Sequence, residues 1–505
     1  MAAGRSCRVV AVGGVGLVPF AAGVIALRKA VLVLALSALS ACTVGPDYER
    51  PAVSGEVGAW SLPDVETGTL AAEPWREMDD PVLTALIEQA LAANLDIAIA
   101  EARLRQARAG LDAARGGRLP QVQAMGSATR QRLSENGQLP VGAIPGFAPE
   151  YSLYDAGFDA SWELDLWGGN RRAVEAAQDR LAASQALRQE ARLRVVAEVV
   201  RAYSELRQAQ AEQAIRVRRV EASGTIAQLS RQSFEVGEIG RSEAANAEAA
   251  AKAEAARSPE SDARARAAAN ALALMTAQPP EAMADLLASP ADLPEPPAAV
   301  QAGLRADVLR RRPDVIAAEA QLAAATADVG VQTAELFPKI SLLGSIGQQA
   351  RTIGDLADSG STRFTVGPSL SWPIFAGGRI RAQIRAAGAR AEEAGAEYEK
   401  AVLGALADSE TALNRYNAAL AGWQDLVAAR ERAEVALQMA RQRYEAGEDS
   451  RIQYNQARLA FAEADLAAVQ AKAQAIEAHA ALVKALGGGV APDDETATGS
   501  DFSAN

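Results

Sequence analysis

The chain has 505 residues, of which 49% are hydrophobic and only 5% aromatic, and its formal charge at pH 7 is −12. That acidic balance argues against a nucleic-acid partner, because phosphate backbones select basic surfaces. One histidine and two cysteines leave almost nothing to ligate a transition metal or to act as a nucleophile, and no phosphate loop or Ser/His/Asp arrangement is present. We therefore expect no enzymatic activity, no cofactor and no metal site. We expect His479, in an Ala-rich helix, to lie on the surface or to fill a packing position.

Residues 1–41 have the features of a secretory signal. The apolar run Ala30–Ala41 holds about a dozen residues, whereas a transmembrane helix needs roughly 20. Its end, Leu39-Ser40-Ala41-Cys42, resembles a bacterial lipoprotein signal, in which the cysteine is lipidated and becomes the first residue. The alternative is a plain secretory signal with an incidental cysteine. Thr43 stands where an inner-membrane lipoprotein has Asp, which favours the outer membrane.

Residues 1–23 do not fit that signal. They add a second apolar stretch and Cys7, which indicates that the start codon has been assigned too early. Without Cys7 the mature chain has one cysteine, and no disulfide is possible. Residues 1–41 carry four cations and no acid, so the mature chain has a charge of −16.

The rest of the chain is an internal duplication, in which four motifs occur twice in the same order. Each half is predicted to run helix, strand, loop, strand, long helix, turn, helix, and the Pro-rich stretch Ser289–Pro297 links the halves. The paired motifs are DIAIAEARL (96–104) with DVIAAEAQL (314–322), LPQV (119–122) with FPKI (337–340), LWGGNRR (166–172) with FAGGRIR (375–381), and SFEVGE (233–238) with RYEAGE (443–448).

Four short segments alternate apolar with small or polar residues over about ten positions, which is typical of transmembrane β-barrel strands. An ordinary half-buried sheet alternates too, and the lipoprotein signal favours the barrel. Tryptophans near the strand ends would suit an aromatic girdle at the membrane surface. The segments are 121–129, 157–166, 339–347 and 364–374, and the tryptophans are Trp162, Trp167 and Trp372.

Three carboxylates share one face of the second segment. Asp159, Glu163 and Asp165 alternate with Trp162 and Leu164. A charge facing lipid at mid-membrane costs a few kcal/mol, so we expect all three in the lumen. Repeated by symmetry, they would form acidic rings that favour cations.

Four strands cannot close a barrel, which needs at least about eight. Several chains must therefore pool their strands, and symmetric closure is the usual solution.

The helices between these segments are long. Residues 171–235 span roughly 95 Å at 1.5 Å per residue, and residues 379–445 are similar. The latter carry apolar residues at coiled-coil spacing. Shorter helices laid end to end, such as 314–335 with 242–276, reach a similar length. The pattern predicts a layer of helices, flat or closed into a tube around water.

These residues resemble the outer-membrane efflux proteins of the TolC and OprM type, and most closely the NodT-like lipoproteins. The resemblance covers nearly all of the mature chain and rests on CTVGPDYERP from Cys42, WREMDDPVLTALIEQALAANLDIAIAEARLRQA from Trp75, DVLRRRPDVIAAEAQLAAATADVG from Asp307 and LFPKISLLGSIG from Leu336. RRRPD alone is weak, since Pro313 in a first helical turn explains it.

The resemblance implies a mainly α-helical fold with a membrane β-barrel. Three chains would form a 12-stranded barrel, continued by a coiled-coil tunnel across the periplasm. Its partners would be outer-membrane lipid, a periplasmic adaptor and an inner-membrane pump, and small molecules would be exported. Two alternatives stay open: a duct for type I protein secretion, and, from another class, a periplasmic coiled-coil scaffold lipoprotein.

The predicted organisation has six parts. They are the signal (1–41), a lipid-anchored and equatorial segment (42–93), a first efflux repeat (94–288), a linker (289–305), a second repeat (306–487) and a disordered tail (488–505).

Two turns and one helix face are the candidate sites that the resemblance adds. Gly237 and Gly447 each follow a long helix, where glycine adopts the left-handed C-terminal conformation cheaply. In the family such turns contact the adaptor, which assigns that role here to Val236, Gly237, Glu238, Ala446, Gly447 and Glu448.

The family's narrowest point resembles an apolar ring followed four residues later by an acidic one. Counted from Gly447, these positions are Ile452 and Gln456, and the first repeat has Asn246 in the place of Gln456. Amides here replace a carboxylate, so closure should depend little on pH and divalent ions. The alternative is that this face packs in the coiled coil, with Glu243 and Arg451 the next gate candidates.

Overall fold

A computed structural model describes residues 43–51, 60, 71, 73–134, 148–300 and 303–488. Cys42, the signal with its start codon, and the tail from residue 489 lie outside the described residues. Two compact units are present. Of the described residues, unit 1 comprises 43–46, 115–134, 148–173 and 327–385, and unit 2 comprises 47–51, 60, 71, 73–114, 174–300, 303–326 and 386–488.

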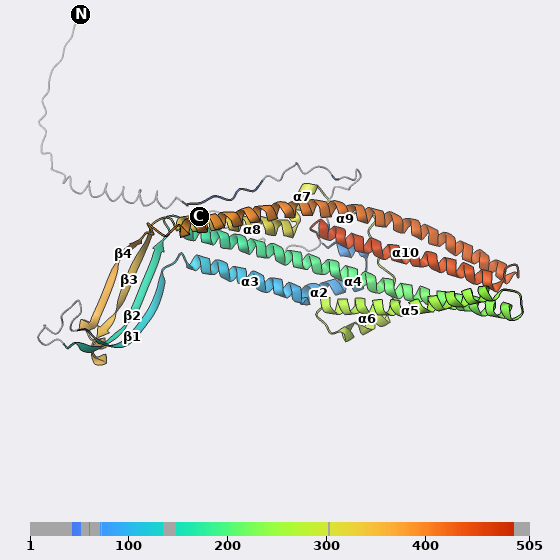
Figure 1. The fold of residues 1–505 in the computed structure, drawn as a ribbon, viewed down its shortest axis with the longest axis horizontal. Coiled ribbons are helices and arrows are strands. Elements are labelled where there is room, and N and C mark those ends of the chain that lie inside the picture. Colours follow the sequence, from blue (N-terminus) through green and yellow to red (C-terminus); the bar gives the residue numbers. More distant parts are fainter. Residues whose placement is uncertain are drawn as a thin grey trace, which may run out of the picture. The chain divides into compact units, whose positions relative to one another are not determined.

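The elements of the two halves follow one another in the predicted order (Figure 1). A short 3-10 helix (Pro74–Met78) and α2 (Pro81–Ala93) precede the first repeat, and α6 (Ala284–Ala288) and α7 (Arg305–Arg311) precede the second. The first repeat is α3 (Leu95–Gly116), β1 (Gln121–Arg132), β2 (Glu150–Leu164), α4 (Gly169–Glu235) and α5 (Arg241–Met275). The second is α8 (Pro313–Ala334), β3 (Lys339–Ala350), β4 (Thr362–Ser371), α9 (Arg379–Glu445) and α10 (Arg451–Ala485).

Unit 1 contains one antiparallel sheet in the order β1-β2-β3-β4. All four strands extend further toward the β1–β2 and β3–β4 loops than the alternation predicts, because ladder hydrogen bonds continue where the side chains are polar. At the other end, β2 stops at Leu164 and β4 at Ser371, earlier than predicted.

The helix lengths repeat between the halves. Both α4 and α9 have 67 residues, and both α5 and α10 have 35. The predicted bounds of α9 are confirmed, and α4 begins two residues earlier than predicted. Within unit 2, the turns that follow α4 and α9 lie at the same end of the helices (Figure 1).

The predicted pairing of helix 314–335 with helix 242–276 is wrong, because each short helix stacks on one from its own repeat. Asn94, just before α3, donates from Nδ2 to the carbonyl of Met275, the last residue of α5, at 2.9 Å. Arg312, just before α8, donates from Nη1 to the carbonyl of Ala485, the last residue of α10, at 3.1 Å. A helix end leaves carbonyls without intrahelical partners, so each junction supplies a donor where one is needed.

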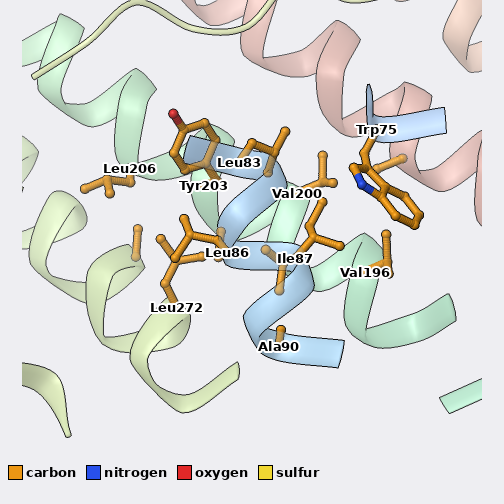
Figure 2. Packing of buried hydrophobic residues seen from close by; sticks show 14 of the residues in the cluster. Trp75, Leu83, Leu86, Ile87, Ala90, Val196, Val200, Tyr203, Leu206 and Leu272 are labelled. Atoms are coloured by element: carbon orange, nitrogen blue, oxygen red, sulfur yellow. The ribbon is translucent and has the colours of Figure 1, made fainter. Parts of the chain in front are cut away.

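The largest core cluster of unit 2 joins α2, α4 and α5 (Figure 2). Leu83 and Ile87 are fully buried against α4, and Leu272 of α5 closes the layer. Asp80 caps α2 by accepting from the backbone N–H groups of residues 82 and 83, both at 2.9 Å. The Tyr203 hydroxyl of α4 donates to the same carboxylate at 2.7 Å, and burial raises the pKa of Tyr203 to about 12.

One described helical stretch, Pro81–Gly116, is long and apolar enough to cross a membrane by length and composition alone. Its first part is α2, whose Leu83, Ile87 and Ala90 belong to the core cluster, and a buried core helix passes the same test. A third of the apolar window is buried, so the core accounts for part of its hydropathy.

Candidate functional site: pore face, anchor, tips and gate

The register of the sheet separates a polar face from an apolar one. Asp159 lies opposite Ser345, and Glu163 opposite Ser341. The other face carries Phe158, Ile346 and Phe364, which are 57%, 58% and 75% exposed in the single chain. These three residues lie directly opposite one another across β2, β3 and β4 and are nevertheless largely exposed in the single chain. A polar face opposite an exposed apolar face is the arrangement of a wall with water on one side and lipid on the other.

Asp165 does not share the setting of Asp159 and Glu163. It follows the end of β2, so the strand alternation that grouped the three carboxylates does not extend to it. Its Oδ1 accepts from the backbone N–H of Asn170 at 3.1 Å and its Oδ2 from that of Arg171 at 2.9 Å. Asp165 thus holds the first turn of α4, where a carboxylate also complements the helix dipole.

The polar face holds a further charged pair that the sequence analysis missed. The Arg363 guanidinium of β4 reaches across β3 to Asp155 of β2, with Nη2 at 2.6 Å from Oδ1 and Nε at 2.8 Å from Oδ2. Its Nη1 donates to Ser345 Oγ at 2.7 Å. The alternation of β2 could have found Asp155, but Tyr151 and Leu153 share its face and conceal the pattern.

Indole groups mark the end of the sheet nearest the helices. Trp162 Nε1 donates to the carbonyl of Arg118 at 2.9 Å, and Trp372 Nε1 donates to that of Leu336 at 3.1 Å. Trp167 Nε1 donates to the carbonyl of Pro338 at 2.7 Å. Rings with an apolar body and a satisfied polar edge suit a membrane surface.

The first described residues are tied to this same end of unit 1. The backbone N–H of Val44 donates to the carbonyl of Trp167 at 3.1 Å, and Arg172 Nε donates to the carbonyl of Val44 at 3.4 Å. A Cβ added to Gly45 would lie 2.4 Å from Gly330 Cα, so only glycine permits this approach. The segment after Cys42 is therefore fixed at the strand–helix junction.

The two turns of unit 2 have the same backbone. Gly237 has φ +81° and Gly447 φ +78°, which confirms the predicted left-handed conformation. The N–H of Glu238 donates to the carbonyl of Ser233 at 2.8 Å, and that of Glu448 to Arg443 at 2.9 Å, as in a Schellman motif. All six residues assigned to the turns are exposed, with Val236 at 73%.

The gate candidates lie in the first turns of the returning helices. Ile452 is half-buried and Gln456 is exposed, one turn apart on α10, and Asn246 is exposed on α5. Glu243 and Arg451 are also exposed, at the starts of α5 and α10. The buried residue between the two α10 candidates is Asn455, whose Nδ2 donates to the carbonyl of Arg451 at 2.8 Å.

Among the residues the structure describes, no group of three or more His, Cys, Asp or Glu could hold a metal ion. His479 is 1% exposed, with its ring centroid 5.4 Å from that of Tyr416, so of its two expected roles the packing one is confirmed. Four strands with one polar and one exposed apolar face, joined to 67-residue helices, define a subunit of an outer-membrane channel.

Comparisons with known proteins agree. The family described as "Outer membrane efflux protein" matches residues 86–278 and 304–488. The "Probable efflux pump outer membrane protein TtgC" of Pseudomonas putida is 30% identical over 480 residues, covering 92% of this chain and 96% of the relative. "Nodulation protein T" of Rhizobium leguminosarum bv. trifolii is 29% identical over 380 residues, covering 74% and 79%. The solved outer-membrane channel OprN shares 36% identity with a TM-score of 0.78, covering 89% and 99%.

The chain belongs to the outer membrane efflux protein family. It is an outer-membrane channel of an efflux pump and extends into the periplasm. Three chains assemble, and their four strands each make a 12-stranded barrel. The members of this family are ducts of efflux systems.

Proposed function

We propose that this chain is the exit duct of a tripartite pump for small toxic molecules, receiving them from an inner-membrane pump through a periplasmic adaptor. It does no chemistry of its own. The carrying observation is the pair of equivalent exposed turns at one end of the long helices, around Gly237 and Gly447. Deletion of the gene should lower resistance to several unrelated drugs, and unchanged resistance in a strain without redundant channels would refute the proposal.

The turns are the adaptor contacts in this proposal. Each offers exposed backbone beside a glycine that a bulky residue cannot replace without strain. Gly237→Val and Gly447→Val should abolish efflux while trimers still form. Gly237→Asn is the matched control, because asparagine tolerates positive φ and so separates backbone conformation from adaptor contact. Full resistance in both valine variants would remove the turns from the docking site.

The closed end of the tunnel is assigned to Ile452 and Gln456. Four residues apart on α10, they share a helix face and can point inward together. The pair Ile452→Gly and Gln456→Gly should raise resting conductance in planar bilayers and admit vancomycin-sized molecules into cells. Ala457→Gly has a similar helix-propensity cost on another face and should change neither. Unaltered conductance would move the gate to Asn246, Glu243 or Arg451.

The pore prefers cations in this proposal. Asp159 and Glu163 supply six carboxylates in a trimer, whereas the ion pair with Arg363 neutralises Asp155. Asp159→Asn with Glu163→Gln should abolish cation preference in reversal-potential measurements. Asp165→Asn removes one negative charge per chain from the helix cap, against two in the double variant, and should leave selectivity intact. Equal effects of the two changes would contradict the assignment.

Cys42 is the proposed lipid anchor. The support is the short distance along the chain to Val44 and Gly45, which are fixed beside Trp167. An acyl group there would enter the leaflet at the rim of the barrel, and two or more acyl chains anchor stably. Intact mass should show an acylated N-terminus at Cys42, and Cys42→Ser should leave an unmodified precursor. A mature N-terminus elsewhere without acyl mass would refute the assignment.

A further inference from the structure

The sheet of one chain has two open edges. Among the residues that the structure describes, β1 pairs only with β2, and β4 only with β3. Every residue of β1 is exposed, and the segment after β4 carries Ile374 and Phe375, which are 85% and 91% exposed. The pore is therefore incomplete until β4 of one chain pairs with β1 of a second copy. We call this junction the seam, and the single chain does not by itself give its register.

The duplication supplies a rule for the register. Elements of the first repeat from β2 onward recur 210 residues later, since α4 begins at Gly169 and α9 at Arg379. The elements before β2 recur 218 residues later, since β1 spans Gln121–Arg132 and β3 Lys339–Ala350.

Contacts within the sheet obey both offsets. In the first hairpin Gln121 pairs with Ser161, and the offsets turn this pair into Lys339 with Ser371, which is the register observed in the second hairpin. The indole bond from Trp162 to the Arg118 carbonyl likewise becomes that from Trp372 to the Leu336 carbonyl, which is also observed. The two hairpins are thus equivalent without a shift.

We infer that the seam between β4 and β1 of the next chain repeats the register of the β2–β3 junction within a chain. That junction pairs Asp159 with Ser345. The offsets convert it into Ser369 opposite Ser127 of a second copy, on the polar face. In this register the polar side chains of β4 and β1 lie on the same side of the sheet, so the apolar residues of both chains face the lipid. On the polar face the seam pairs are Thr365 with Gln131, Gly367 with Thr129, Ser369 with Ser127 and Ser371 with Met125.

A shift by two residues would also preserve the faces, so alternation alone cannot select this register. The duplication selects it, because the open edges belong to strands whose counterparts already pair within the chain. The occupant of the edge is a second copy, since the trimer is complete only when three such seams close.

Disulfide cross-linking tests the register. Directly opposite residues have Cβ atoms about 4.5–5.5 Å apart and diagonal ones lie about 7–8 Å apart, whereas a disulfide requires about 3.5–4.5 Å. With an added oxidant, purified trimers of Ser369→Cys with Ser127→Cys should form covalent dimers and trimers on denaturing gels. Ser369→Cys with Met125→Cys, or with Thr129→Cys, should react at least tenfold more slowly.

Two controls keep the test decisive. Asp159→Cys with Ser345→Cys marks the junction inside one chain and should form an internal disulfide that leaves the denatured protein monomeric. Each single variant should form native trimers and no cross-link. Faster reaction of a shifted pair, or no interchain product while the internal control reacts, would overturn the inferred register and leave the trimer itself unaffected.

Discussion

The two repeats use different side chains where their short helices stack. At the first junction a buried amide, Asn94, donates to the carbonyl of Met275 and accepts from the N–H groups of Asp96 and Ile97. At the second junction a buried guanidinium, Arg312, holds the carbonyl of Ala485. Asn94 and Arg312 occupy equivalent positions, and both are less than 10% exposed.

The surroundings of the two junctions differ as well. The tilted rings of Tyr416 and His479 pack together in the second repeat, where the first has Leu206 and Ala269. Ala277 occupies the left-handed position after α5, and Gly487 the one after α10. Equal helix lengths therefore do not require equal chemistry, provided that the carbonyls at each helix end find a donor.

Of the variants at the two junctions, Arg312→Ala should lower the stability of the protein most. Arg312 binds Asp314 through two hydrogen bonds of 2.9 and 2.6 Å, and lies 3.5 Å from Asp408. Arg312→Ala leaves a buried carbonyl without its donor and should cost about 3 kcal/mol or more. Thermal unfolding of the trimer would measure this loss of stability. Arg312→Lys should recover only part of the lost stability, because lysine lacks the planar guanidinium that makes two parallel hydrogen bonds. A loss below that of Asn94→Ala would contradict this ranking.

Low pH should reduce the stability contributed by the second junction and leave that of the first unchanged. Burial lowers the pKa of His479 to about 4, while the unfolded chain keeps the ordinary value near 6.5. The unfolded state thus binds more protons between these values, so stability falls as the pH drops from 6.5 toward 4, by about 2 kcal/mol at pH 5. His479→Gln cannot titrate and should remove this component of the pH dependence. An unchanged profile in that variant would exclude His479 as the cause.

Asn94→Ala should have a smaller effect. It removes a helix cap and one hydrogen bond to a carbonyl, which together contribute about 1–2 kcal/mol. Asn94→Asp keeps the capping oxygen and loses only the amide donor, so its unfolding temperature should fall between those of the parent and Asn94→Ala. If Asn94→Asp were the less stable of the two, charge repulsion rather than the missing donor would control this junction.

The smallest effect concerns the residues that end α5 and α10. Ala277 has φ +54°, a strained conformation for a residue with a Cβ, so Ala277→Gly should stabilise by about 1 kcal/mol or less. The reverse exchange, Gly487→Ala, should destabilise, since its Cβ would also lie 2.9 Å from the backbone N of Arg312. Changes of the same sign in both unfolding temperatures would refute the comparison.

Local signals allowed the sequence to predict the long helices well. α9 lies between Gly377-Gly378 and the turn at Gly447, and all three glycines have positive φ, so its bounds were recognisable. The strand ends were not, because ladder pairing continues through residues such as Gln131 and Gln348 that carry no apolar alternation.

Which short helices stack end to end could not be predicted from the sequence, for a different reason. Asn94 and Arg312 occupy aligned positions of the two repeats, but their side chains are unlike, so the sequence does not reveal that both donate to the carbonyl at the end of a helix. Asp165 was grouped with Asp159 by parity alone, yet its role depends on where the strand stops. The Asp155–Arg363 pair required the β2–β3–β4 register, which sequence periodicity does not supply.

The equal lengths of α4 and α9, 67 residues each, limit which genetic changes the family scaffold can accept. One codon inserted into α4 alone would rotate its turn by about 100° and advance it by about 1.5 Å, while the turn after α9 stayed in place. The insertion would also need a matching residue in the returning helix α5. A tolerated change in length therefore has to occur together in the four helices α4, α5, α9 and α10. It would come in multiples of seven residues, because seven residues rotate the apolar face of a helix by only about 20°. Length variants should be far rarer in these helices than in the β1–β2 loop.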